Sequence, residues 1–86
     1  MPTISQFFGI AIRMYYDDHS PPHFHAYYAG SATKIEIETL RVLEGAIPRR
    51  ALALVLEWAA EHRDELIGNW QLAEDHQPLI RIAPLE

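Results

Sequence analysis

The stretch PRRALALVLEWAAEHRDELIGNWQLA, residues 48–73, carries the strongest structural signal in the chain. Side chains suited to burial recur there at intervals of three and four, the spacing of one helical face: Leu52, Val55, Ala59, His62, Leu66, Trp70 and Ala73. Pro48 suits the first position of a helix, and Gly68 projects onto the opposite, polar face. The pattern predicts one long helix, with a bend or a split at Gly68 as the alternative.

The residues around this helix favour β-strands. Residues 8–15 and 23–28 alternate between apolar and polar positions, and residues 33–38 place isoleucines opposite charged side chains. Residues 41–45 and 79–85 are weaker candidates, the latter an edge strand because Pro78 and Pro84 flank it. We therefore expect three to five strands.

These elements predict an α+β fold, in which an antiparallel sheet of three to five strands carries one long α-helix on one face. With 86 residues the chain forms one domain, residues 1–86, of modest stability. The helix is expected to cover the apolar face of the sheet, formed by Ile10, Ile12, Met14, Phe24, Ala26, Ile35 and Ile37.

Composition narrows the class of protein. The chain has no cysteine, which excludes disulfides and thiolate chemistry and agrees with a cytoplasmic location. Its net charge of −5 argues against electrostatic binding of nucleic acid over a large surface. The N-terminal stretch does not resemble a signal peptide, and the longest apolar run is interrupted by Glu57, so we expect no contact with a membrane.

The opposite face of the predicted sheet is polar and rich in side chains that carry chemistry. Its members are Arg13, Tyr15, His23, His25, Tyr27, Lys34 and Glu36. His23 and His25 are neighbours on this face, about 7 Å apart along the strand. We consider three roles for them.

In the first role the two histidines bind a divalent metal with His19 and with Asp17 or Asp18 from the adjoining loop. Because an H-x-H pair on a strand is common by chance, the sequence favours no metal or other cofactor.

In the second role His23 or His25 is a general acid or base, while Arg13 binds an anion and Tyr15 or Tyr27 orients the substrate. In the third role both histidines only pack and form hydrogen bonds on the sheet, and this is the interpretation that the sequence favours.

Two further features point to binding. Arg49 and Arg50 lie at the start of the helix, where cations oppose the helix dipole, and they suggest either an anion site or ion pairs with nearby acids. The apolar arc of the helix is wider than a small sheet can cover. A partner would then contact Leu54 and Trp58, or Tyr27 on the outer face of the sheet, unless the C-terminal segment covers the helix.

The stretches PTISQFFGIAIRMYYDDHSPPHFHAYYAG, IEIETL and PRRALALVLEWAAEHRDELIGNW together resemble the domain-of-unknown-function 4160 (DUF4160) family of small bacterial and archaeal proteins. PPHFH followed by the LEWAxxH helix is the specific pair of motifs. The resemblance implies no activity and no catalytic residues. It implies a gene pairing with another small protein that is described as toxin–antitoxin-like.

We therefore expect a protein-interaction module, the toxin-like half of such a pair, that binds a small protein encoded nearby or a second copy of itself. The alternative is a small ribonuclease-like hydrolase. Its acid/base groups or metal ligands would be His23 and His25, and Arg13, Arg49 or Arg50 would contact phosphate.

Overall fold

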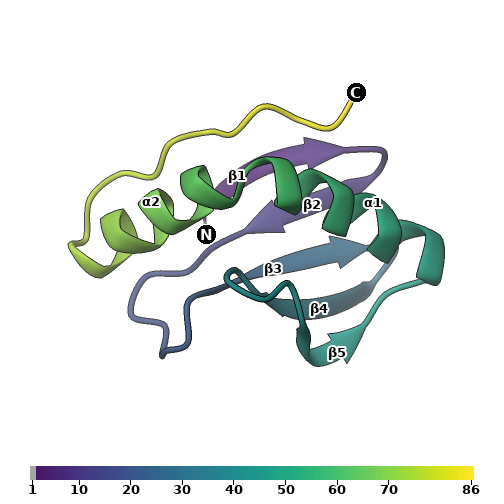
Figure 1. The fold of residues 1–86 in the computed structure, drawn as a ribbon, viewed down its shortest axis with the longest axis horizontal. Helices are drawn as coiled ribbons and strands as arrows, with labels where there is room; N and C mark the ends of the chain where they lie inside the picture. Colours follow the sequence, from purple (N-terminus) through teal and green to yellow (C-terminus); the bar gives the residue numbers. More distant parts are fainter. Residues whose placement is uncertain (1) are drawn as a thin grey trace.

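The apolar alternation of the strands builds one continuous inner face, which two helices cover in the computed structural model (Figure 1). The structure describes residues 2–86, and Met1 lies outside them. Neighbouring strands pair antiparallel in chain order. The strands are β1 (Thr3–Phe7), β2 (Ile10–Arg13), β3 (His23–Tyr28), β4 (Ser31–Glu36) and β5 (Val42–Ala46), and the helices are α1 (Arg49–Glu61) and α2 (Arg63–Glu74).

The predicted α+β class and inner face are confirmed. Every predicted inner residue of the sheet is completely buried: Ile10, Ile12, Met14, Phe24, Ala26, Ile35 and Ile37. Trp58 of α1 lies at the centre of this core, with its ring 5.4 Å from that of Phe7 and 6.0 Å from that of Phe24. Burial of this apolar surface is the main source of stability for the two layers.

The prediction of a strand over residues 8–15 is wrong in its bounds. Two strands meet there, because Phe8 and Gly9 form a tight turn with φ angles of 49° and 78° between β1 and β2. Successive positive φ values match the twist of a two-residue hairpin. Phe8 therefore lies at an exposed turn, and β1 is a strand that the sequence did not reveal.

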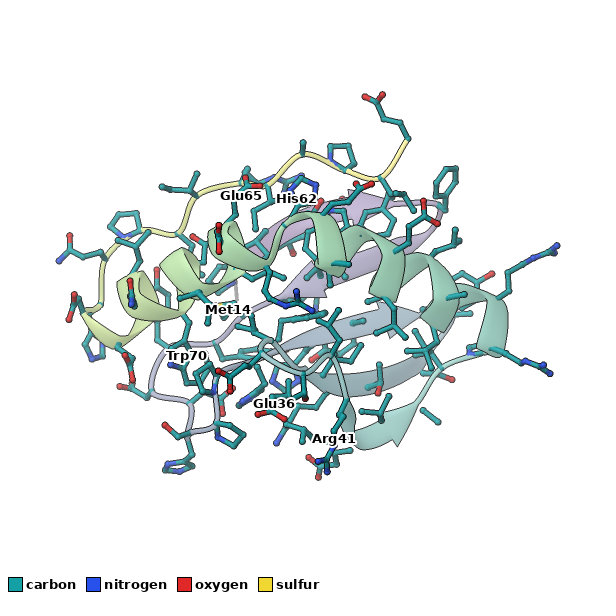
Figure 2. The ribbon with its side chains drawn as sticks, viewed as in Figure 1. Met14, Glu36, Arg41, His62, Glu65 and Trp70 are labelled. Atoms are coloured by element: carbon teal, nitrogen blue, oxygen red, sulfur yellow. The ribbon has the colours of Figure 1, made fainter. Side chains whose placement is uncertain are left out.

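The long helix is divided, but not at Gly68. The break falls at His62, whose φ of −122° and ψ of 26° are not helical. The His62 N–H donates to the carbonyl of Ala59, three residues back, and its ring contacts Glu65 (Figure 2). A new helix then begins, and the buried stripe continues through Leu66 and Trp70.

The C-terminal residues form no strand, which corrects the prediction for residues 79–85. They run in extended form beside the helices and β1 (Figure 1), with a backbone hydrogen bond from the Ile82 N–H to the carbonyl of Ile4. The side chain of Asn69 holds the same segment, since its amide donates to the Ile80 carbonyl and accepts from the Ile80 N–H, each at 2.8 Å. Trp58 Nε1 donates to the carbonyl of Ala83 at 2.8 Å.

The helices of residues 2–86 are both too short, and too interrupted by charge, to cross a bilayer.

We predict that Asn69→Ala lowers the free energy of unfolding by about 1–3 kcal/mol, because it removes two hydrogen bonds from a buried amide. Urea denaturation measures the loss. Gln71→Ala, an exposed change on the same helix, should shift the free energy of unfolding by no more than about 0.5 kcal/mol. If Asn69→Ala and Gln71→Ala lowered the free energy of unfolding equally, Asn69 would not hold the C-terminal segment.

Candidate functional site

The loop between β2 and β3 brings a carboxylate onto two histidines of β3. His23 and His25 are two residues apart and so lie on one side of the strand. Asp18 Oδ2 lies 2.8 Å from Nε2 of His23 and 3.3 Å from Nε2 of His25. These three side chains, Asp18, His23 and His25, are called the Asp–His–His cluster below.

His23 is held from both ends of its ring. Its Nδ1 lies 2.7 Å from the carbonyl oxygen of Pro21, which can only accept, so Nδ1 carries a proton. The ring lies 5.1 Å from that of Trp70 and 5.2 Å from that of His25. Figure 2 shows Trp70 between α2 and the β2–β3 loop. Only 2% of His23 is exposed, so this histidine shares the outer side of β3 with His25 but is covered, in part by Trp70.

The cluster perturbs the acidity of its members. Burial raises the pKa of Asp18, but hydrogen bonds from His25 and His23, the charge of His23 and the N–H of His19 outweigh it, and the pKa lies below its usual value. Burial lowers the pKa of His25, and the charges of His23 and Lys34 lower it further, against the opposing effect of Asp18. His25 is therefore neutral near pH 7.

On the outer face of the sheet, charged residues of the neighbouring strands flank His25. Arg13 of β2 pairs directly with His25, and His25 pairs directly with Lys34 of β4. Lys34 Nζ forms an ion pair of 3.0 Å with Glu44 of β5. Two cations thus flank the exposed side of the Asp–His–His cluster, where 19% of the His25 side chain is accessible.

Two tyrosines complete the surroundings of His25. The ring of Tyr15 meets that of His25 edge-on at 4.7 Å, and its hydroxyl is hydrogen-bonded to that of Tyr27. The guanidinium of Arg13 lies 4.8 Å from the centre of the Tyr27 ring. Burial, then the hydrogen bond with Tyr15, raises the pKa of Tyr27 to about 12, so its hydroxyl stays protonated at neutral pH.

A hollow of about 320 Å³ opens beside the cluster, between the β2–β3 loop and α2. Asp18 lines it together with Tyr15, Asp17, Trp70, Ala73 and Glu74. The charged residues of this lining, within the part of the chain that the structure describes, are all acids. The hollow therefore gives small molecules and cations a route to Asp18.

The structure brings together Arg13, Tyr15, His23 and His25, which were the predicted catalytic residues. It does not add the other predicted metal ligands. His19 is exposed and contributes only its backbone N–H to Asp18, and Asp17 lies 3.2 Å from His76 instead. Asp18 is the carboxylate that joins the histidines, and two adjacent aspartates in a loop gave no sequence signal to choose between them.

The predicted binding residues have separate places. Arg49 and Arg50 are exposed at the start of α1, at the end of the sheet opposite the cluster, so they do not contribute to it. Trp58 is fully buried under the C-terminal segment and is not available to a partner. Leu54 is partly buried, and Tyr27 is engaged with Tyr15.

Fold and site together define a small α+β protein with a His-His-carboxylate cluster at the start of its middle strand. The sequence profile of a domain of unknown function, DUF4160, matches residues 9–71, and the chain belongs to this family. The match includes every residue of the cluster. Searches of curated proteins and of solved structures found no match.

Proposed function

We propose that the protein is a small hydrolase that cleaves phosphodiester bonds, as a ribonuclease does. The observation that supports this proposal most strongly is the convergence of two imidazoles on Asp18, with Arg13 and Lys34 on either side of His25. Groups that exchange protons or bind a metal thus adjoin groups that bind an anion. The net charge of −5 restricts recognition to a short segment of the substrate.

In the proposed reaction a hydroxyl oxygen of water, or of the ribose, attacks the phosphorus and forms a new P–O bond. The P–O bond to the leaving oxygen breaks, and that oxygen takes up a proton from water. The Asp–His–His cluster would accept the proton of the attacking hydroxyl. A metal ion held by the same three side chains would supply Lewis-acid activation of that hydroxyl. Arg13 and Lys34 would stabilise the negative charge on the phosphoryl oxygens.

The test is turnover of a fluorophore–quencher single-stranded oligoribonucleotide and of bis(p-nitrophenyl) phosphate by the purified protein. His25→Ala should lower kcat by about 100-fold or more, because it removes the accessible member of the cluster. His76→Ala, which removes an exposed histidine outside the cluster, should leave kcat unchanged. Circular dichroism confirms that both variants are folded. Absence of hydrolysis in the wild type, or equal rates in the wild type and His25→Ala, would contradict the proposal.

A second candidate function, the toxin-like half of a cytoplasmic two-protein complex, is favoured by an exposed aromatic residue at a strained position. Phe8 has a φ of 49°, which costs a non-glycine residue about 1–2 kcal/mol, and 61% of it is exposed. It borders an apolar hollow of about 230 Å³ that Leu54 and Arg50 also line. An exposed aromatic side chain beside an apolar hollow is suited to anchoring a partner.

For this second function we predict that Phe8→Asp weakens a one-to-one complex with the small protein encoded nearby by at least about tenfold. Co-expression followed by size-exclusion chromatography with light scattering measures the complex. Ile80→Asp is the matched control, since Ile80 is an equally exposed apolar residue outside the hollow. A protein that elutes alone, or a complex that Phe8→Asp leaves intact, would contradict this function.

A further inference from the structure

The Asp–His–His cluster brings together the donor atoms of a metal site. One nitrogen of each histidine and one carboxylate oxygen all lie within 4.8 Å of one another. Atoms that bind one zinc ion at about 2.0–2.2 Å are separated from each other by roughly 3–3.5 Å. The separations of 2.8 and 3.3 Å between Asp18 Oδ2 and the two Nε2 atoms are close to this spacing.

The hydrogen bond of His23 to Pro21 determines which nitrogen faces the carboxylate. Because Nδ1 donates its proton to the Pro21 carbonyl, the neutral ring directs the lone pair of Nε2 at Asp18 Oδ2. Two acceptors 2.8 Å apart repel each other unless a positive charge lies between them. That charge is either a proton on Nε2, which makes a buried ion pair, or a metal ion. A carbonyl behind Nδ1 is the usual support of a histidine that binds a metal through Nε2.

The surroundings favour a metal ion over a proton. His25 directs a second Nε2 at the same oxygen, so two imidazole nitrogens and one carboxylate oxygen converge on one point. The hollow beside Asp18 also carries Asp17 and Glu74, whose charges attract cations. It leaves room for water as a further ligand, and an open position of this kind distinguishes catalytic from structural zinc sites.

We propose that Asp18, His23 and His25 bind one divalent transition-metal ion of the zinc type. Two imidazole nitrogens and one carboxylate oxygen suit zinc, cobalt or iron, whereas magnesium and calcium prefer ligand sets made of oxygen alone. The ion replaces the proton between His23 and Asp18, which is released to solvent. The proposal concerns the residues of the proposed hydrolase but does not depend on hydrolysis.

The test is titration of the EDTA-treated, dialysed protein with ZnCl₂ by isothermal calorimetry, and with MgCl₂ in parallel. The wild type should bind one equivalent of zinc and no magnesium. Saturating zinc should raise Tm by at least about 5 °C, because an ion that binds only the folded chain stabilises it. Asp18→Asn and His25→Ala should each weaken zinc affinity by about 100-fold or more.

His19→Ala and His76→Ala are the matched controls, because both remove exposed histidines near the same loop and should leave zinc affinity unchanged. CoCl₂ gives an independent readout, since the visible absorption of bound cobalt should be lost in His25→Ala and retained in His19→Ala. Absence of saturable zinc binding, or binding that survives Asp18→Asn and His25→Ala, would overturn the proposal.

The activity assay distinguishes failure of the metal site from failure of the proposed function. Zinc binding at the cluster without hydrolysis supports the site and overturns the hydrolase. Hydrolysis that needs His25 in a protein that shows no saturable zinc binding supports the hydrolase and overturns the metal site.

Discussion

The rest of the structure depends on the burial of one face of the five-stranded sheet. Trp58 of α1 and Trp70 of α2 cover that face. Trp58 joins three parts of the chain, because its ring packs on Phe7 and Phe24 and its indole N–H bonds to Ala83 of the C-terminal segment. Trp70 of the second helix reaches beyond the apolar core and packs on His23. The interactions that stabilise the fold therefore also position the site.

This coupling explains how so small a chain holds a polar cluster at the edge of its core. A buried imidazole is costly unless both of its nitrogens have partners. In His23 one nitrogen is bound to the Pro21 carbonyl and the other faces Asp18. The β2–β3 loop supplies both partners, so the conformation of this loop and the chemistry of the site depend on each other.

The inner face of the sheet could be predicted from sequence because alternation has a single physical cause, the burial of one side. Tight turns and terminal segments were harder to predict. Phe8 continues the apolar alternation but lies in a turn, and the C-terminal residues look like a strand but are held by Asn69 and Trp58. The break at His62 has no glycine or proline to mark it, whereas Gly68 continues the helix.

The site was predictable only in part. Alternation put His23 and His25 on one face with Arg13 and Tyr15, as the structure does, but it did not reveal that His23 is buried there. The strand pattern carries no information about α2, whose Trp70 covers His23. The choice of Asp18 over Asp17 depends on the path of a loop, which local sequence does not determine.

The most direct test of the account is anomalous X-ray diffraction from crystals grown with zinc, recorded above and below the zinc absorption edge. The account predicts one strong peak per chain, at about 2.0–2.2 Å from Nε2 of His23, Nε2 of His25 and an oxygen of Asp18. It would be contradicted by crystals in which the zinc peaks lie only at exposed residues such as His19 or His76, with Asp18 still in direct contact with His23.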